Sequence, residues 1–310
     1  MKEKIFTAKA PASVANLGPG FDLLGAALSK PWDSVTARWN SGNKIVIDKI
    51  SGDGQQLSQD PGKNVIGIVA AALREKRGIR RGITLSLKKG IPFAAGLGGS
   101  AASSVAAALA VNALLGSPYS KEELLPFAMK GEAFVSGDVH WDNILPALLG
   151  GLILLTSKKP LRFLRLKYPK QMKLIVITPN FSIETKKARR RIPHHIPLEL
   201  ALKQSAALAH LLFALQNNQW GEEENICLDF IAEPKRASLI PGLLQSKENA
   251  LKAGAYGSSI SGSGPSLFAL CKGSVALTVA KEMAKVWEKN GMETKSYITS
   301  LNPHGAFLIK

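Results

Sequence analysis

The sequence predicts an α+β fold in two domains, or in one large fused domain, and three observations support this expectation. Segments whose apolar residues alternate with polar ones, as in strands, lie among segments whose apolar residues recur at helical spacing. Both kinds of segment occur in both halves of the chain, which is typical of α+β proteins. The chain has 310 residues, 45% of them hydrophobic, and a domain usually takes roughly 150 residues.

The first half mixes short strands with helices. Val35, Ala37 and Trp39 alternate with polar residues, which predicts a strand. Residues 64–76 carry apolar side chains at helical spacing, and Gly78 ends the predicted helix. On the same criteria, the predicted strands of this half are residues 5–9, 33–39, 44–49, 82–88 and 151–156, and the predicted helices are residues 64–76, 100–115 and 121–134.

The second half, from about residue 158, shows the same alternation. Residues 198–215 form a long pattern with a strongly apolar helical face. Two short strands are expected on either side of a second glycine-rich loop. The predicted strands are residues 173–178, 256–260, 266–270 and 294–299, and the predicted helices are residues 198–215, 222–232, 243–253 and 275–289.

Charge and cysteine content limit the class of protein. The formal net charge is +17, which fits a solvated basic surface, anionic small molecules or, least well, nucleic acid, because the basic residues are dispersed. The one dense run is at residues 186–191. Two cysteines without a CxxC or Cys/His cluster argue against disulfides and structural zinc. The N-terminal residues hold no apolar run of signal-peptide length, so we expect a cytoplasmic protein.

Residues 90–120 carry no charge and therefore need comparison with a membrane span. The stretch begins with proline and several glycines, and its second half is mostly alanine with Ser103, Ser104 and Asn112. Glycines break helices and alanine inserts weakly into a bilayer. We expect a loop followed by a buried helix of a soluble domain.

The strongest local signal is the glycine-rich run at residues 92–104, between a predicted strand and a predicted helix. Glycines let backbone N–H groups approach a ligand, and the start of a helix adds unpaired N–H groups and a positive dipole end. The run predicts a phosphate site, with tight helix–strand packing as the alternative. It lacks the lysine of a Walker A motif and matches a dinucleotide fingerprint only in part.

Two further stretches are unusual. Residues 257–266 form a second glycine-rich run, which is equally typical of a plain hairpin turn. Residues 11–22 place Asn16 and Asp22 on a loop constrained by glycine and proline. A carboxylate and an amide on a rigid loop suit recognition of a small polar substrate, although both residue types also serve turns.

These three stretches, in this order, resemble the motifs of the GHMP kinase family, named for galacto-, homoserine, mevalonate and phosphomevalonate kinases. Residues 13–22 (Ser-Val-Ala-Asn-Leu-Gly-Pro-Gly-Phe-Asp) are similar to the opening motif of the branch that acts on homoserine. Residues 92–102 resemble the ATP loop, and residues 260–265 resemble the third motif. Shorter matches extend the resemblance over nearly the whole chain, at residues 63–65, 131–133, 140–143, 185–189 and 233–241.

The resemblance implies a two-domain fold, with the active site between a ribosomal-protein-S5-like N-terminal domain (1–157) and a ferredoxin-like C-terminal domain (158–310). It implies ATP-dependent, Mg²⁺-assisted phosphorylation of the side-chain hydroxyl of L-homoserine, a step of threonine biosynthesis. The enzyme would be a cytoplasmic homodimer with a small-molecule substrate, without nucleic-acid or membrane partners. The alternatives are a related kinase acting on another alcohol and a non-enzymatic binding protein on the same scaffold.

The resemblance also implies a role for each matching residue. Asn64 would hold the adenine, and Ser100 and Glu132 would coordinate Mg²⁺. The triphosphate would be wrapped by Pro92, Phe93, Ala94, Ala95, Gly96, Leu97, Gly98, Gly99, Ser100, Ala101 and Ala102. The amino acid would be bound by Asn16, Asp22, His140, Arg189 and Arg236, with Asn143 beside its hydroxyl and Thr185 near the reacting oxygens. A carboxylate suits the ammonium of a zwitterion, and guanidinium groups suit its carboxylate.

Several of these residues also have ordinary structural interpretations. His140 is compatible with a core histidine, Glu132 with an exposed helix residue, and Arg189 with a solvated basic face. The sequence departs from the family pattern in two places. Gly99 stands where a serine is frequent, and Trp141 stands where a small residue is usual, which raises the question of a reshaped substrate pocket.

Overall fold

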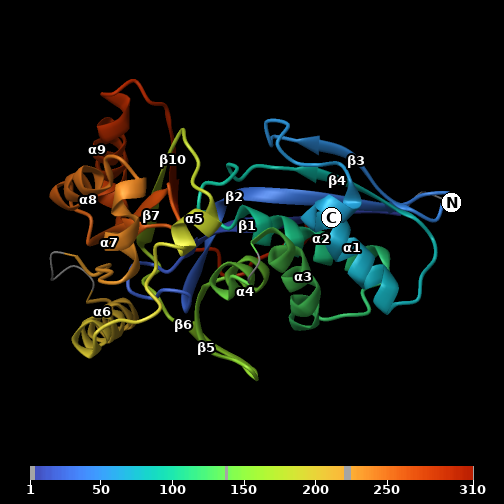
Figure 1. The fold of residues 1–310 in the computed structure, drawn as a ribbon, viewed down its shortest axis with the longest axis horizontal. Helices are drawn as coiled ribbons and strands as arrows, with labels where there is room; N and C mark the ends of the chain where they lie inside the picture. Colours follow the sequence, from blue (N-terminus) through green and yellow to red (C-terminus); the bar gives the residue numbers. More distant parts are fainter. Residues whose placement is uncertain (1–3, 137–138, 220–224, 310) are drawn as a thin grey trace.

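A computed structural model describes residues 4–136, 139–219 and 225–309 of the chain. Figure 1 shows two halves side by side, with α1–α4 on one face of a large sheet and α6–α9 around a smaller one. In the first half the elements are β1 (Ile5–Ala15), β2 (Leu24–Trp39), β3 (Ile45–Ser51), α1 (Val65–Lys76), β4 (Ile83–Lys88), α2 (Gly99–Leu114), α3 (Leu125–Ser136), α4 (Trp141–Leu149), β5 (Leu152–Lys158) and β6 (Leu161–Leu166), with short 3₁₀ turns at Pro61–Lys63 and Glu122–Leu124. In the second half they are β7 (Met172–Pro179), α5 (Thr185–Arg189), α6 (Leu198–Asn217), α7 (Ala232–Arg236), α8 (Leu243–Lys252), β8 (Gly257–Ile260), β9 (Leu267–Lys272), α9 (Ala276–Glu288), β10 (Thr294–Thr299) and β11 (Phe307–Ile309), with 3₁₀ turns at Ala237–Leu239 and Gly273–Val275.

The larger sheet has the strand order β11-β1-β2-β4-β3, and β5 pairs with the start of β2 and with β6. β3, α1 and β4 form a parallel crossover unit within it. The sequence predicts only residues 33–39 of β2, because the start of that strand is rich in Gly and Ala. Gly25 is needed there, since the main-chain oxygen of Asp142 lies 1.8 Å from the position of an added Cβ.

Helix α2 forms the centre of the first half. It packs against β1 and β2 on one side and against α1, α3 and α4 on the other. Its alanine-rich residues are almost all buried, from Ala101 to Leu114, because small side chains allow close approach on every side. The expectation of a loop and a buried helix at residues 90–120 is therefore confirmed.

The smaller sheet has the strand order β10-β7-β9-β8, and all of its pairs are antiparallel. With α8 and α9 the elements run β-α-β-β-α-β, which is the ferredoxin-like arrangement. Both helices contribute to a second apolar core with β7, β8 and β9. The predicted α+β architecture with a ferredoxin-like second half is confirmed.

Helix α6 lies at the outside of the second half. Among the described helices, it alone is long and apolar enough to cross a membrane by length and composition, and 22% of its most apolar window is buried. A single helix that passes on those grounds is weak support for a span. Gln204 fixes α6 to the fold, because its side chain donates to Pro19 O (2.9 Å) and accepts from the Phe230 N–H (2.8 Å).

Several elements differ from the sequence prediction. The helix predicted at 222–232 is wrong for residues 225–231, which are irregular, and residues 222–224 lie outside the described part. The Asp229 carboxylate accepts hydrogen bonds from the N–H groups of residues 231–233, so the helix begins only at α7. Strand β1 continues to Ala15, with an irregular register near Pro11. The sequence analysis did not identify α4, β6, α5 or β11.

Strands β6 and β11 belong to the larger sheet, although they follow the predicted domain boundary. β11 pairs with β1, so that the sheet combines strands from near both ends of the described chain. The division at residues 157 and 158 remains a prediction.

Candidate active site

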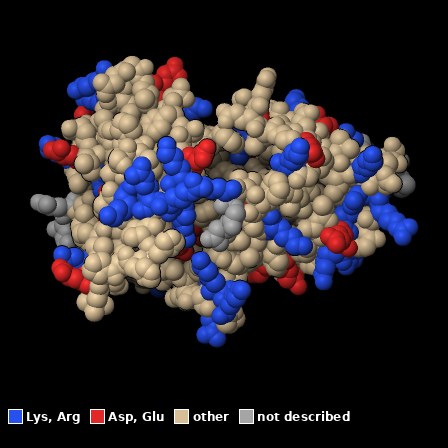
Figure 2. Space-filling view, in the orientation of Figure 1, with Lys and Arg blue, Asp and Glu red and all other residues tan. Residues whose placement is uncertain are grey.

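A cavity of about 410 Å³ is lined by residues of both halves. Figure 2 shows a hollow between the halves, with Lys and Arg side chains gathered beside it. The lining includes residues 92–100, the ends of α3 and α4, α5 and the β8–β9 loop. All of the predicted site residues line this cavity except Ala101 and Ala102, which are buried within α2.

The loop before α2 has the backbone geometry of an anion site. Gly96 and Gly98 have φ values of +74° and +64°, which glycine adopts without strain. Gly98 caps α2, and no side chain in the described chain makes a capping hydrogen bond there. Unpaired N–H groups at the start of a helix can hold a phosphate. The Ala102 N–H already donates to Gly98 O at 2.9 Å, which argues against its place among the phosphate ligands.

The second glycine-rich run is a hairpin turn that also connects the two halves. Ser261 Oγ donates to Gly96 O at 2.8 Å, and the Ser266 N–H donates to Ala95 O at 3.2 Å. The Gly262 N–H donates to Ala15 O at 3.2 Å. The hairpin interpretation of residues 257–266 is confirmed, and the β8–β9 turn also holds the 92–100 loop from the other half.

A buried ion pair lies under the phosphate loop. Lys89 and Asp33 pair at side-chain exposures of 5% and 0%. Asp33 Oδ1 accepts from the N–H groups of Gly90 and Ile91 at 3.0 and 3.1 Å, where the loop begins. Lys89 Nζ donates to Gly99 O at 3.0 Å, where the loop ends. The ion pair thus joins the two ends of the loop, and its ammonium group lines the cavity.

Charged groups that also line the cavity gather around Phe21. Arg189 Nη1 lies 2.6 Å from Asp22 Oδ2. Arg236 is 5% exposed and donates from Nη1 to Gly262 O at 2.8 Å. Both guanidinium groups lie over the Phe21 ring, 5.2 and 5.4 Å from its centroid. One carboxylate and two guanidinium groups can recognise both ends of an amino acid.

Asn16 and Asn64 each have hydrogen bonds within the protein. Asn16 Oδ1 accepts from the Asp22 N–H at 3.0 Å, and its Nδ2 donates to Gly262 O at 3.2 Å. Asn64 caps α1 by accepting from the Ile66 N–H at 3.2 Å. The turn interpretation therefore holds for Asn16, and the structure adds a capping role for Asn64; both residues also line the cavity.

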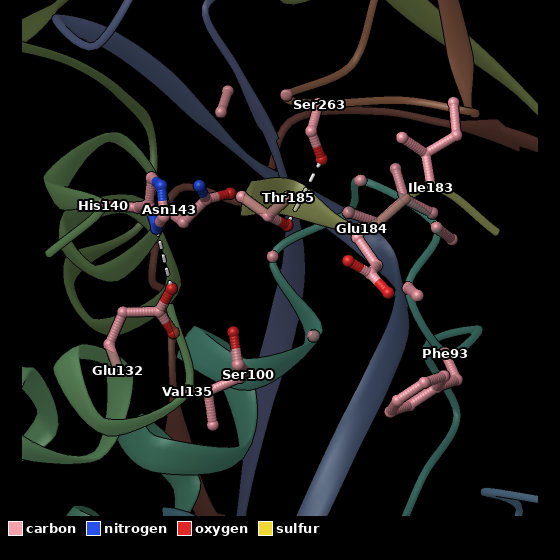
Figure 3. A pocket seen from close by; sticks show the side chains of 18 of the residues that line it. Phe93, Ser100, Glu132, Val135, His140, Asn143, Ile183, Glu184, Thr185 and Ser263 are labelled. Carbon is pink, nitrogen blue, oxygen red and sulfur yellow. Dashed lines mark hydrogen bonds and ion pairs between the residues drawn. The ribbon is translucent and has the colours of Figure 1, made fainter. Parts of the chain in front are cut away.

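Ser100 and Glu132 lie on the same side of the cavity, on α2 and α3 (Figure 3). Glu132 Oε1 lies 3.0 Å from His140 Nδ1. Burial by itself lowers the pKa of His140, but the hydrogen bond and charge of Glu132 outweigh it and raise that pKa above its ordinary 6.5. Within the described residues, no cluster of three or more His, Cys, Asp or Glu side chains is arranged to hold a metal.

Figure 3 also shows Thr185 and Asn143 at the cavity, where Thr185 Oγ1 lies 3.4 Å from Ser263 Oγ. Trp141 does not line the cavity and packs in the core of the first half at 8% exposure. The suspicion that its indole narrows the substrate pocket is therefore not supported.

Several polar residues around the cavity were not predicted as site residues. Lys89, Ser103, Asp142 and Glu184 line it, and Ser13 hydrogen bonds to Asn143. Three of them, Ser13, Ser103 and Asp142, stand within the quoted motifs at residues 13–22, 92–104 and 140–143, and Lys89 lies three residues before the second of these. Their place in or beside those motifs was the available signal.

Asp142 is a buried carboxyl group whose ionisation is unfavourable. Burial raises its pKa from 3.8 to about 7, and the negative charges of Asp22 and Glu132 add to the effect while His140 opposes it. Between these two values the folded state holds a proton that the unfolded chain has released. The stability that this proton provides is therefore complete at low pH and is lost as the pH rises towards 7.

We accordingly expect Asp142→Asn to stabilise the protein at about pH 8 by up to about 4 kcal/mol, and to leave stability unchanged at about pH 4. The measurement is urea unfolding of both proteins across this range, in EDTA and without nucleotide. Asp142 also interacts with Arg236, so Arg236→Met is included as a control for that partner. A stability difference that is the same at every pH would contradict the assignment.

Comparison with known proteins agrees with this geometry. The model of the GHMP kinases N terminal domain matches residues 64–151, and that of the GHMP kinases C terminal domain matches residues 200–289. The homoserine kinase of Chloroherpeton thalassium is 39% identical, over 99% of this chain and 100% of the relative. The homoserine kinase of Chlorobium phaeovibrioides is 37% identical, over 97% of this chain and 98% of the relative.

A solved structure extends the agreement to the whole fold. The crystal structure of homoserine kinase from Cytophaga hutchinsonii has a TM-score of 0.95 and 38% sequence identity, and covers 100% of this chain and 98% of that one. Both halves of the chain and the cavity between them are thus accounted for by one family. On these grounds the chain belongs to the GHMP kinase family, among its homoserine kinases.

Proposed function

We propose that the protein transfers the γ-phosphoryl group of ATP to the side-chain hydroxyl of L-homoserine, forming O-phospho-L-homoserine and ADP in threonine biosynthesis. The observation that carries this proposal is that Asp22, Arg189 and Arg236 line the same cavity as the 92–100 loop. The carboxylate suits the ammonium of the amino acid, and the guanidinium groups suit its carboxylate. The substrate hydroxyl would then lie between this cluster and the loop.

We propose that Mg²⁺ is held by Ser100 and Glu132 together with phosphate oxygens. Mg²⁺ favours oxygen ligands and usually binds through one or two carboxylates plus substrate phosphates, which suits a site with few protein ligands. Its chemical contribution would be to neutralise charge on the phosphates. His140 fixes the Glu132 carboxylate through the 3.0 Å contact of Nδ1 with Oε1.

The chain's own residues would act mainly by positioning. The loop N–H groups hold the triphosphate, Lys89 keeps the loop in place through Gly99 O, and the charged cluster fixes the amino acid. The homoserine oxygen forms a bond to the γ-phosphorus as the bond to the β-phosphate oxygen breaks, and the hydroxyl proton leaves late, to an oxygen of the transferred phosphoryl group. Asn143 lies beside that hydroxyl, and Thr185 lies near the transferred group. Phosphoryl transfer of this kind needs alignment and charge neutralisation more than a strong base.

We further propose that the protein is a cytoplasmic homodimer that acts on small molecules rather than on nucleic acid or membranes. The feature that supports the homodimer is the apolar stripe on α6, where Leu198, Leu202 and Phe213 are 75%, 60% and 59% exposed. A patch of this kind is typical of a protein–protein interface.

The test of the function is ADP release by the purified protein with Mg²⁺ and ATP. We expect turnover to be strongest with L-homoserine and weak with L-serine, L-threonine, mevalonate and shikimate. The phosphorylated product is identified by mass spectrometry. Turnover with another alcohol in place of L-homoserine would leave a kinase of different specificity, and nucleotide binding without turnover would indicate a binding protein.

A further inference from the structure

The phosphate loop and Asn143 lie on separate elements, and one buried serine contacts both. Ser13 lies on β1 and is 0% exposed. Its hydroxyl donates to Asn143 Oδ1 at 2.8 Å, across 130 residues of sequence. Its backbone N–H donates to Leu97 O, within the phosphate loop, at 3.1 Å. Ser13 therefore connects the group that would hold ATP with the residue beside the acceptor hydroxyl.

Gly98 packs directly on this pair. A Cβ added at Gly98 would lie 2.2 Å from Ser13 Oγ and 2.6 Å from Asn143 Oδ1. No side chain fits at that distance, so the loop backbone closes against the hydrogen bond itself. β1, the phosphate loop and α4 thus meet at a single point, and a shift of one element displaces the others.

The same hydrogen bond decides which end of the Asn143 amide lies where. The oxygen is the end held by Ser13, and Nδ2 lies 3.5 Å from Asp142 Oδ1. The ionised Asp142 carboxylate can only accept, so it favours this orientation of the amide over the reversed one. Nδ2 is therefore the end that remains for the cavity, so that Asn143 acts there as a hydrogen-bond donor.

We propose that Ser13 is a positioning residue, which sets the register between the phosphate loop and Asn143 and orients the amide of Asn143. The inference rests on the proposed function, because it concerns the alignment of donor and acceptor in that reaction. Ser13 is buried behind both groups and acts through Asn143. Its loss would disturb the alignment of the reacting atoms more than the binding of either substrate.

The experiment is a double-mutant cycle with Ser13→Ala and Asn143→Ala. We expect Ser13→Ala to lower kcat about 10- to 100-fold, with both KM values changed less than about threefold. In the Asn143→Ala background, Ser13→Ala should lower kcat almost no further, because the side chain through which Ser13 acts is already absent. Ser13→Cys, which keeps the size and a weak S–H donor, should lie between wild type and Ser13→Ala.

Ser246→Ala provides the matched control. Ser246 is another fully buried serine, on α8 away from the cavity lining, whose Oγ donates to Met283 O at 3.2 Å. We expect its replacement to leave kcat unchanged, and thermal unfolding verifies that every variant is folded. If Ser13→Ala does not fold, the cycle is run with Ser13→Cys.

Three outcomes are distinguished by this design. An unchanged kcat in Ser13→Ala, or effects of the two substitutions that multiply, would overturn the positioning role while leaving the function intact. Equal losses in Ser13→Ala and Ser246→Ala would reduce the effect to general packing. Absence of homoserine turnover in the wild-type protein would instead overturn the proposed function.

Discussion

Replacing Arg236 by methionine is expected to raise the KM for L-homoserine about 10²–10³-fold, with little change in the KM for ATP. Arg236 is almost fully buried, so its guanidinium group meets a substrate carboxylate away from water, where a charge pair is strongest. Methionine keeps much of the apolar part of the side chain over Phe21 and removes the guanidinium group with its two parallel N–H donors. Steady-state kinetics with each substrate varied in turn provides the measurement.

The substitution should disturb the fold little. Gly262 O, which accepts from Arg236, also accepts from Asn16 Nδ2 at 3.2 Å and would keep that partner. Arg236→Lys retains the charge without the bidentate geometry, and we expect it to lie between wild type and Arg236→Met. Arg190→Met removes an exposed arginine that does not line the cavity and serves as the matched control. Equal weakening of homoserine and ATP binding would contradict a role at the amino-acid end.

The second large effect is expected at Lys89. Lys89→Met leaves the Asp33 carboxylate buried without its cation, which typically costs about 3–5 kcal/mol of unfolding free energy. The same change releases the end of the loop at Gly99 O, to which Lys89 Nζ donates. We therefore expect the KM for ATP to rise about 10- to 100-fold as well. Urea unfolding and ATP titration are the two measurements.

An exposed ion pair provides the control for charge removal alone. Lys252 pairs with Glu248 on α8, and both side chains are more than half exposed. Lys252→Met is expected to change stability by less than about 1 kcal/mol and to leave ATP binding as it is. If Lys89→Met were no more destabilising than Lys252→Met, the buried pair would not be the support of the loop that its contacts indicate.

Local signals were sufficient to predict the glycine-rich loop before α2, the long helices and most strands. The glycines at 96 and 98 lie between an alternating strand and an alanine-rich helix, and each of these patterns is short-range. The same was true of the ferredoxin-like half, where strand and helix patterns follow in order. Hydrophobic periodicity and glycine content depend only on residues close in sequence, so they can be read in a window of ten or twenty residues.

Long-range contacts explain what was missed. The Asp33–Lys89 pair joins residues 56 apart, and the Ser13–Asn143 hydrogen bond joins residues 130 apart. Ser13 and Asp33 do not look unusual within their strands, and only the fold brings Asn143 and Lys89 to them. The helix predicted at 222–232 failed in its described part because Asp229 bonds to the backbone and delays the helix start. Helix propensity alone does not show that a side chain will take backbone N–H groups away from the helix, because this depends on where the side chain lies in the fold.

The pairing of β11 with β1 has a consequence for the protein as it is made. Ala8 lies opposite Leu308 in this ladder. One edge of the larger sheet therefore stays unpaired until a strand about 300 residues further along the chain has been translated. At roughly 5–20 residues per second, the ribosome needs about 15–60 s to supply it. During that interval the outer edge of β1 has unpaired N–H and C=O groups that can pair with a strand of another polypeptide chain. The nascent protein is thus most exposed to edge-to-edge aggregation after its first helices exist and before translation delivers β11.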